Sequence, residues 1–478
     1  MKASRQQTTA GLLASLLIAG MPFCAASADT LLDSLRATGL PMVAVETVDG
    51  EEPTCEYLRA ADGYPANTIR NATKVPGRVV VTERGDTLYD SGPWEKDVSG
   101  MTIKMRGNNS AFRRKHPFKL KLQKKADMLA RGDGDRYKDK EWVLLDGSTL
   151  NLMTGMAVSR LAGLQWTPAY RYVNLLFNGD YRGTYILCES VKRNPGCRLD
   201  VSKEEGFIVE DDPFWWKEEV YVKSTASNCR YTLLYPDPDD ATQEQLDYAQ
   251  KRLSAWEQST KTGTYDEHID VESFAAWLLA HDILGNSDAA GSNLFLTWYD
   301  SGSKIKMGNL WDLDTNYACE DEWARIHTWN GFFFGYMLES DNQSLAAAYV
   351  RKWDEVGAWL FAQMEARLDS FLLSDGYRAL ERSRSLERVH VAPMASVAYG
   401  VEQARSWFSR REAWLGGAVE ELRERLLTSG VQPLPLPQEP PSAWPVYRLD
   451  GARVTPQARP SRPGLRIGQG RKWVSKTK

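Results

Sequence analysis

The chain has 478 residues, of which 42% are hydrophobic and 26% are charged, and its formal net charge is −4. The apolar fraction is large enough for a sizeable core and excludes a disordered chain, and the negative net charge excludes a general binder of nucleic acids. The six cysteines form no C-x-x-C pair, which predicts no zinc site and leaves open one or two disulfide bonds.

The N-terminus has the features of a secretory signal peptide. Lys2 and Arg5 precede an apolar run over 11–21, and Ala26 and Ala28 form a small-x-small cleavage site. The run is too short for a transmembrane helix, and no later apolar stretch reaches the roughly 18 residues that such a helix needs. The sequence therefore predicts an exported protein without a transmembrane segment, located in the periplasm, at the outer cell surface or outside the cell.

The first part of the mature chain is predicted to be rich in β-structure. Residues 29–100 contain short β-prone runs separated by Gly, Pro and Asp. Two further strands, over 101–105 and 118–122, flank a polar and basic loop over 106–110. This order predicts a β-hairpin whose loop is available for binding.

A helix and a second hairpin follow. Apolar residues recur at three- and four-residue steps over 150–161, which predicts a helix with one face in the core. The dipeptide Asn178-Gly179 then joins two β-prone runs, 172–177 and 181–189. Asn-Gly between such runs is a strong signal for a tight hairpin turn.

The remainder of the chain is predicted to be mainly helical. Residues 242–257 begin with a threonine and, three residues later, a glutamine in capping-box spacing, and 271–284 are apolar on more than one face, which predicts a buried helix. The pattern from 320 to 425 is again helical, with several tryptophans as packing residues. Six prolines over 431–445 predict an extended linker.

The buried helix leads into the segment with the most chemical information. The loop after it carries Asp288 and Asn293, and a predicted hairpin then ends in a turn that carries Asp312 and Asp314. Phosphoryl transfer needs a carboxylate near the attacking hydroxyl and further oxygen ligands for a divalent cation, and oxygen-only ligands suit Mg²⁺ or Mn²⁺ rather than zinc. The same residue types are also common turn formers, and the pattern alone does not separate the two interpretations.

The loop over 106–110 is predicted to fold over a triphosphate. It offers backbone N–H groups, a hydroxyl and a guanidinium, although it contains neither G-x-G-x-x-G nor a Walker A motif. The next strand places Lys119 and Lys121 on one face, where Lys119 is favoured to reach the α- and β-phosphates and a solvated strand face is the alternative. Glu189 ends the hairpin where a kinase fold connects its lobes, with a structural ion pair as the alternative. The predicted nucleotide-binding residues are therefore Arg106, Gly107, Asn108, Ser110, Lys119 and Glu189.

Five ordered parts of the sequence resemble the spore-coat CotH kinases, secreted or surface proteins with an atypical protein-kinase fold. These parts are 106–110, 118–122, 177–189, 407–414 and, counted as one part, the segments 285–288 and 311–314 with Asn293 between them. The resemblance spans about residues 40–420. It implies an α+β, two-lobed kinase-like fold with a β-rich N-terminal lobe and a mainly helical C-terminal lobe.

The resemblance also implies roles for individual residues. It implies ATP and Mg²⁺ or Mn²⁺ as cofactors, Asp288 as the catalytic carboxylate assisted by Lys119, and Asn293 and Asp312 as metal ligands, with Asp314 sharing or assuming the metal role. Thr154 departs from the asparagine that relatives tend to carry. A glutamate partner for the lysine is not evident in residues 149–162 and stays unassigned.

The C-terminal tail resembles the short sorting domain of type IX secretion substrates. Two β-prone runs, 446–454 and 464–474, follow the linker, and residues 431–478 hold nine Lys or Arg against two Asp or Glu. The predicted organisation is thus a signal peptide (1–28), a kinase-like domain (29–425) with a β-rich lobe (29–190) and a helical lobe (191–425), a proline-rich linker (426–445) and a small β tail (446–478).

Together these features predict an exported protein kinase that phosphorylates serine or threonine in secreted or surface proteins. Its expected partners are an exported protein substrate and, through the tail, a secretion machinery, but no nucleic acid. Two alternatives stay open. One is a non-catalytic surface or matrix assembly protein that keeps the fold, and the other is a carbohydrate-associated surface protein.

Overall fold

The computed structural model describes residues 25–429 apart from several short gaps, together with the backbone of a C-terminal hairpin. The gaps are 148–149, 291, 320–331 and 388–395, and the hairpin strands are β16 (Leu465–Gly468) and β17 (Arg471–Val474). This hairpin lies within the second β-prone run of the tail. The predicted signal peptide and the proline-rich segment lie outside the residues whose side chains are described.

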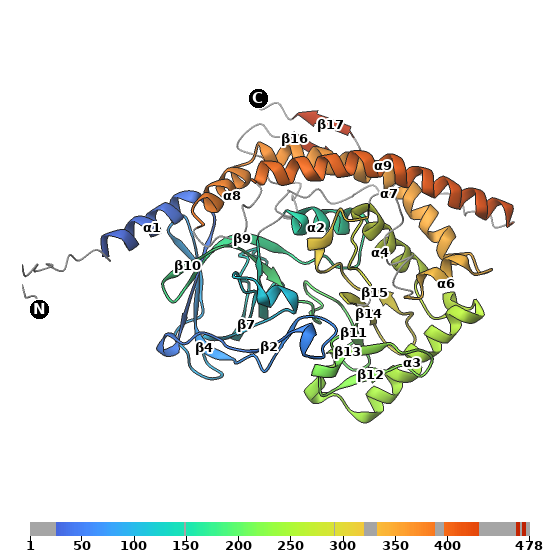
Figure 1. Cartoon of the computed structure of the whole chain (residues 1–478), viewed down its shortest axis with the longest axis horizontal. Coiled ribbons are helices and arrows are strands. Elements are labelled where there is room, and N and C mark those ends of the chain that lie inside the picture. The colour runs from blue at the N-terminus through green and yellow to red at the C-terminus, as the bar shows by residue number, and fades with distance from the viewer. Residues whose placement is uncertain are drawn as a thin grey trace, which may run out of the picture.

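An eight-stranded sheet closes on itself in the N-terminal half and forms what we call the barrel region (Figure 1). The strand order is β1-β9-β10-β8-β7-β6-β4-β5, and β1 also pairs with β4, so the ring closes and β5 is attached outside it. Closure leaves fewer unpaired strand edges. The strands are β1 (Met42–Thr47), β4 (Val75–Glu83), β5 (Asp86–Asp90), β6 (Met101–Met105), β7 (Phe118–Ala126), β8 (Asp139–Asp146), β9 (Tyr170–Phe177) and β10 (Asp180–Glu189).

Alternation of apolar and polar residues explains why these strands close around a core. In β4 every second residue from Val75 to Val81 is buried, and β6 repeats the pattern from Met101 to Met105. The predicted hairpin turn is confirmed, because Asn178 and Gly179 have φ values of 49° and 83°, as a tight turn requires. A small sheet of β2 (Glu56–Leu58) and β3 (Thr68–Arg70) accompanies the barrel.

The second region combines helices with a sheet of which the sequence predicted only the β14–β15 hairpin. Its strand order is β12-β13-β11-β14-β15, and every neighbouring pair is antiparallel. The strands are β11 (Phe207–Asp211), β12 (Tyr221–Lys223), β13 (Arg230–Tyr235), β14 (Leu294–Trp298) and β15 (Lys306–Met307). The mixed α+β class is therefore confirmed, but the expectation of a mainly helical second half needs correction by this sheet.

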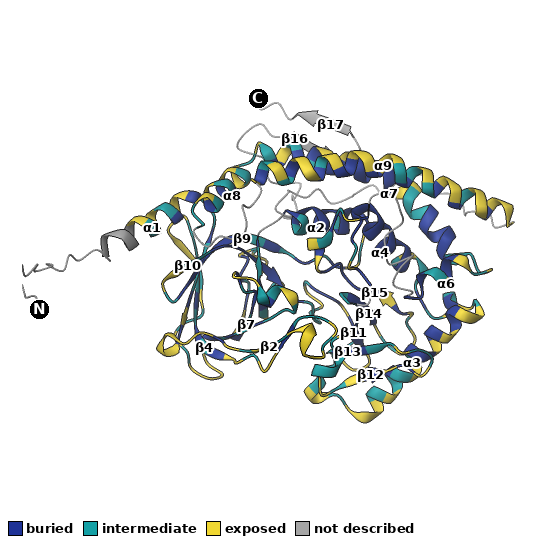
Figure 2. Cartoon of the chain, viewed as in Figure 1, coloured by how far each residue is buried: buried dark blue, intermediate teal, exposed yellow. Residues whose placement is uncertain are grey.

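Long helices complete the second region. The capping box of α3 is confirmed, because the side chain of Thr242 accepts from the N–H of Gln245 and that of Gln245 accepts from the N–H of Thr242. Figure 2 shows that α9 is buried on the face toward the molecule and exposed on the other. No described helix is both long and apolar enough to span a membrane. The helices are α2 (Asn151–Leu161), α3 (Gln243–Thr262), α4 (Val271–Leu284), α6 (Phe334–Glu339), α7 (Ser344–Leu372) and α9 (Val397–Thr428).

Two helices change the predicted boundaries. Residues expected to be β-rich begin with helix α1 (Ala25–Thr38), and α8 (Asp375–Ser385) returns from the second region to the barrel. There the guanidinium of Arg382 donates to the carbonyl of Thr38 at 2.8 Å, and the hydroxyls of Ser383 and Thr184 lie 2.7 Å apart. Figure 1 shows α8 beside α1 and β10. Helix α8 therefore contacts the barrel region across the border that the sequence predicts at residue 190.

The cysteines of the described part form no disulfide bond. Cys188 and Cys319 are buried free thiols, and Cys55, Cys197 and Cys229 are partly buried free thiols. The one or two disulfides that the sequence left open are thus not formed among these five. Burial raises the pKa of the Cys197 thiol to about 11, so this thiol stays protonated at neutral pH.

Candidate functional site

The loop after α4 begins where that helix ends against a glycine. All residues of α4 from Phe274 to Leu284 are buried, which confirms the predicted buried helix. Gly285 follows with φ 56°, a left-handed conformation that stops the helix. Asn286 is fully buried, and its side-chain oxygen accepts a hydrogen bond from the N–H of Asp288 at 2.8 Å. This local bond shapes the loop and leaves the Asp288 carboxylate exposed.

The acidic turn is tied to this loop by the same asparagine. The side-chain amide of Asn286 donates to the carbonyl of Asp312 at 3.4 Å and to the side chain of Asn316 at 3.2 Å. The hydroxyl of Thr315 donates to the Asn286 side-chain oxygen at 2.9 Å. Because Asn286 contacts both segments, it sets how the carboxylates of the loop and the turn face each other. Sequence reasoning treated Asn286 only as part of a motif.

Asp312 has an unusual backbone. Its φ and ψ are 50° and 68°, in the left-handed region that residues with a side chain seldom adopt. Asn293 is also left-handed, with φ 59°. Such conformations cost free energy of order 1–3 kcal/mol and cluster at functional sites. Two of the predicted metal ligands thus share this backbone feature.

Helix α2 supports the acidic turn from the other side. The side-chain amide of Asn151 donates to the carbonyl of Asp314 at 2.9 Å, and that of Asn316 donates to the carbonyl of Asn151 at 3.1 Å. The hydroxyls of Thr154 and Tyr317 lie 2.6 Å apart, within hydrogen-bond distance. Thr154, where the resemblance implied an asparagine, is therefore a structural contact beneath the turn.

The three acidic side chains influence one another. Removal from water, followed by the charges of Asp314 and Asp288, raises the pKa of Asp312 to about 7. Part of Asp312 is nevertheless open to solvent. Partial burial and the charge of Asp314 also raise the pKa of Asp288. The structure thus brings Asp288, Asp312 and Asp314 into one electrostatic neighbourhood.

The donor set fits a divalent cation in its chemistry. The carboxylates provide hard oxygen ligands, and the raised pKa values of Asp288 and Asp312 reflect burial together with neighbouring negative charge that a cation would relieve. The three carboxylates do not converge on one point in this structure. Among the described residues, no three acidic, histidine or cysteine side chains lie close enough together to hold a metal ion. Asp314 instead accepts from the guanidinium of Arg113 at 2.9 Å. Asn293 donates its side-chain amide to the Ser292 hydroxyl at 3.0 Å.

Glu210, on β11, is an acidic residue of the site that sequence reasoning missed. It accepts a hydrogen bond from the backbone N–H of Asn293, and the guanidinium of Arg106 lies close enough to attract it. Burial and the charge of Asp212 raise the pKa of Glu210 to about 8. Since β11 was not predicted, no pattern placed this carboxyl beside the loop that carries Asp288 and Asn293.

The predicted phosphate loop faces the acidic turn. The guanidinium of Arg106 lies 5.7 Å from the ring centre of Trp311 and is attracted by Asp312. Gly107 has φ 92°, and a Cβ there would lie 2.3 Å from the hydroxyl of Ser110, so this position requires glycine. The structure thus places Arg106 at the site and packs Gly107 and Ser110 against each other.

Asn108 is held differently from the expectation. Its side-chain oxygen accepts from the hydroxyl of Thr68 at 2.6 Å and from the ammonium of Lys217 at 3.1 Å. The side chain therefore fixes the loop instead of being directed at a ligand. Lys217 follows β11 in the second region and so joins the two regions at this point. It is another residue that the sequence did not reveal.

Lys119 has an acidic partner. Its ammonium lies 2.7 Å from the carboxylate of Glu141 on β8, the strand next to β7. Lys192 approaches the same carboxylate at 3.8 Å. The acidic partner of Lys119 in the structure is therefore Glu141, which lies on strand β8 and outside residues 149–162. Lys121 is exposed on the same strand as Lys119.

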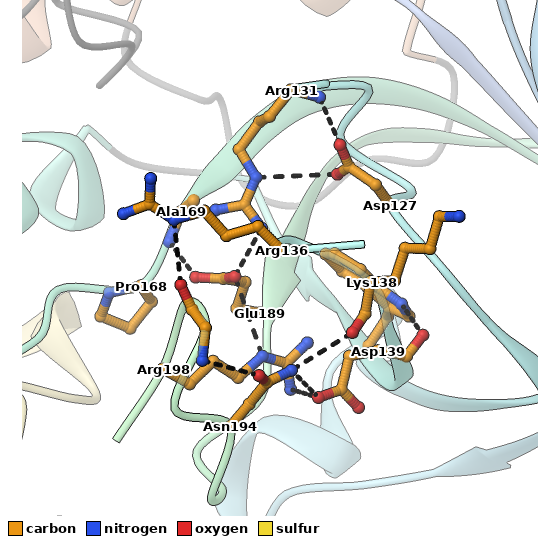
Figure 3. Close-up of polar contacts among 12 residues, drawn as sticks. Asp127, Arg131, Arg136, Lys138, Asp139, Pro168, Ala169, Glu189, Asn194 and Arg198 are labelled. Carbon is orange, nitrogen blue, oxygen red and sulfur yellow. Dashed lines mark hydrogen bonds and ion pairs between the residues drawn. The ribbon is translucent and has the colours of Figure 1, made fainter. Parts of the chain in front are cut away.

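Glu189 requires a correction. It is completely buried, and its carboxylate accepts from the Arg131 guanidinium at 2.7 Å and from the backbone N–H of Ala169 at 2.8 Å. Figure 3 shows this network, in which Arg198 also approaches at 3.8 Å. Because both oxygens have partners and no solvent reaches them, the carboxylate is not free for a nucleotide. Glu189 instead forms the structural ion pair that the sequence offered as the alternative.

Comparison with known proteins adds a family. A model of the CotH kinase protein family matches residues 103–372, more than half of the chain. Among solved structures, the proinflammatory kinase CtkA of Helicobacter pylori has a TM-score of 0.29 and 9% identity, and the alignment covers 61% of this chain and 92% of that one. A complex of HipA, HipB and operator DNA from Shewanella oneidensis MR-1 has a TM-score of 0.24 and 14% identity, covering 59% and 60%. No curated protein matches the chain.

Proposed function

The chain belongs to the CotH kinase protein family, and from this premise we propose that it is an exported, ATP- and divalent-metal-dependent protein kinase for serine or threonine in secreted or surface proteins. The observation that carries the proposal is that Asn286 joins the loop of Asp288 to the turn of Asp312 and Asp314, so that the three carboxylates lie in one electrostatic neighbourhood. Three carboxylates on two adjoining segments are the arrangement that phosphoryl transfer with a bound cation requires. In this proposal the barrel region is the N-terminal lobe and the second region is the C-terminal lobe.

Each residue of the site has a role in the proposal. The exposed carboxylate of Asp288 orients the acceptor hydroxyl and takes up its proton. Asp312, Asp314 and Asn293 would hold Mg²⁺ or Mn²⁺, which when bound neutralises charge on the β- and γ-phosphates. Lys119, oriented by Glu141, and Arg106 bind the phosphates of ATP from the barrel side.

The test is phosphate transfer by the purified mature protein with labelled ATP and either metal. We expect transfer to itself or to exported proteins, and a loss of at least about 100-fold in Asp288→Asn and Asp312→Ala. Asp135→Asn, at a 93% exposed carboxylate on the barrel, is the matched control and should keep the wild-type rate. Wild-type rates in both site variants would reject the proposal.

A non-catalytic assembly protein is the second candidate. The ion pair between Arg113 and Asp314 favours it, because a guanidinium already satisfies one of the carboxylates that a cation needs. Calorimetry separates the two functions. Binding of ATP together with Mg²⁺ supports the kinase, and no binding of either supports the assembly protein.

Export completes the proposal. The charged and apolar N-terminal segment supports removal of residues 1–28, and the short β16–β17 hairpin supports a sorting role for 446–478 through a type IX secretion system. Deletion of 446–478 should retain the protein in the periplasm of the producing cell, as cell fractionation would detect. An unchanged distribution would argue against the sorting role.

A further inference from the structure

An arginine of α9 is buried where the two catalytic segments meet. Arg411 is 1% exposed, although arginine is seldom fully buried without partners. Its Nε donates to the carbonyl of Asp282 at 2.7 Å, and one terminal nitrogen donates to the carbonyl of Cys319 at 3.1 Å. Asp282 lies in the last turn of α4, just before the loop of Asp288, and Cys319 follows the acidic turn. One side chain therefore binds both segments.

The carbonyl groups at the end of α4 accept hydrogen bonds from α9 and from the residues that follow the acidic turn. A helix end leaves carbonyls that need partners from outside the helix. The indole N–H of Trp407, also on α9, donates to the carbonyl of Ile283 at 2.9 Å. The backbone N–H of Tyr317 donates to Leu284 at 2.8 Å, and those of Ala318 and Cys319 donate to Gly285 at 3.0 and 3.1 Å. Helix α9, the end of α4 and the segment after the acidic turn thus form one hydrogen-bonded unit.

Aromatic rings hold Arg411 in place. Its guanidinium lies 4.3 Å from the ring centre of Trp414 and 5.5 Å from that of Trp407. The Trp407 ring in turn fills the space beside Gly285, where a Cβ would lie 2.4 Å from it. A planar guanidinium can stack on these rings and donate in two directions, whereas the ammonium of lysine cannot do both.

We propose that Arg411 is a positioning residue for phosphoryl transfer. It touches no reacting atom, and it sets the separation between the loop that carries Asp288 and the turn that carries Asp312 and Asp314. The inference rests on the proposed kinase function. Displacement of reacting groups by about 1 Å can cost about 100-fold in rate, so a small change at this junction has a large effect.

Arg411→Lys is the informative substitution because it keeps the buried charge and removes the two-directional contact. Arg425→Lys is its matched control. Arg425 lies on the same helix and donates to the backbone carbonyl of Leu338 at 2.8 Å, on α6 and outside the two catalytic segments. Arg425 is exposed and, within the described residues, its side chain makes this one bond, so its substitution controls for the loss from α9 of an arginine that binds a backbone carbonyl outside the two segments.

The kinetic test compares kcat, KM for ATP and the half-saturating metal concentration, at a temperature well below the unfolding midpoint of each variant. In Arg411→Lys we expect kcat to fall about 10- to 100-fold and the half-saturating metal concentration to rise, while KM for ATP stays within about threefold. Arg425→Lys should keep all three values within about twofold of wild type. A folded Arg411→Lys protein with wild-type kcat and metal dependence would overturn the inference.

Hydrogen exchange tests the inference without relying on catalysis. In Arg411→Lys, the peptides that contain Asp288 and Asp312 should exchange at least about tenfold faster than in wild type, and in Arg425→Lys they should not. If the wild-type protein shows no phosphate transfer, the kinase proposal fails while this measurement still decides the role of Arg411. Equal exchange in wild type and Arg411→Lys would overturn it.

Discussion

Leu313 packs directly against Gly155: a Cβ added to Gly155 would lie 2.5 Å from the nearest methyl carbon of Leu313. Leu313 stands between the two aspartates of the acidic turn and is 2% exposed. Helix α2 can approach the turn this closely only because residue 155 has no side chain. The position of the two carboxylates therefore depends on a missing methyl group in a helix that contributes no catalytic group itself.

Gly155→Ala should reduce activity more than stability. Alanine favours the helix by about 1 kcal/mol, which offsets part of the roughly 1–3 kcal/mol cost of overpacking against Leu313. The turn must shift to make room, so we expect phosphate transfer to fall at least about tenfold with a change in melting temperature of only a few degrees. Gly417→Ala on α9, where nothing lies within 4 Å, is the control and should be slightly stabilising and fully active. Wild-type activity in Gly155→Ala would show that the turn does not depend on this contact.

The pair of Lys119 and Glu141 should act as one unit. Lys119→Met and Glu141→Gln are each expected to raise KM for ATP or lower kcat, and the double variant should be little worse than either single one. Lys121→Met tests the alternative lysine and should have a small effect, because that side chain is exposed. Steady-state kinetics of wild type, the two single variants at 119 and 141 and their double variant measures the coupling. Additive losses, or a larger loss for Lys121→Met, would assign the phosphate contact elsewhere.

Local signals in the sequence predicted local structure well. Asn178-Gly179 and the capping box of Thr242 and Gln245 each act through contacts a few residues apart, and the structure has the hairpin and the helix start that they predict. The buried helix α4 follows from composition alone. Helix α4 and the β14–β15 hairpin flank the segments of Asp288 and Asp312 in the order that the sequence predicted, although no distance between them could be predicted.

Long-range contacts explain what the sequence did not reveal. Closure of the barrel needs β1 to pair with β9, more than a hundred residues away, and Glu141 reaches Lys119 only because β8 lies beside β7. Glu210 is polar in a short strand whose partners lie far apart in sequence. Arg411 lies in the 407–414 segment that carries the family resemblance, but its burial could not be predicted, since an arginine in an amphipathic helix is usually exposed. Such residues are found only once distant segments are placed together.

Metal binding should strengthen as pH rises. The pKa of Asp312 is about 7, so below pH 7 this carboxyl keeps a proton that a cation must displace. As pH rises toward 7, we expect the half-saturating Mg²⁺ concentration to fall by up to about tenfold per pH unit. Above pH 7 it should level off. Calorimetric titrations at pH 6, 7 and 8 measure the trend, and Asp312→Asn should remove most of it. Equal affinity at all three pH values in wild type would mean that Asp312 is not a ligand.

A buried histidine should make stability depend on pH. His281 on α4 is 1% exposed, and within the described part of the chain neither ring nitrogen has a hydrogen-bond partner. Burial lowers the pKa of His281 to about 3, whereas an unfolded histidine titrates near 6.5. Between these values only the unfolded state binds the proton. The contribution of neutral His281 to the free energy of unfolding is therefore complete above about pH 6.5. It is lost as pH falls toward 3, by up to about 1.4 kcal/mol per pH unit.

His281→Leu isolates this contribution. Urea unfolding at pH 4.5, 5.5, 6.5 and 7.5 should show a free energy of unfolding that falls less steeply with decreasing pH in the variant than in wild type, whatever the difference at pH 7.5. His268→Leu, at a histidine that is only partly buried, controls for the general effect of removing an imidazole and should leave the wild-type slope largely unchanged. Because the comparison uses slopes, a cavity or a packing change that shifts all four values equally does not affect it. Parallel profiles of wild type and His281→Leu would show that this side chain does not stay neutral in the folded protein.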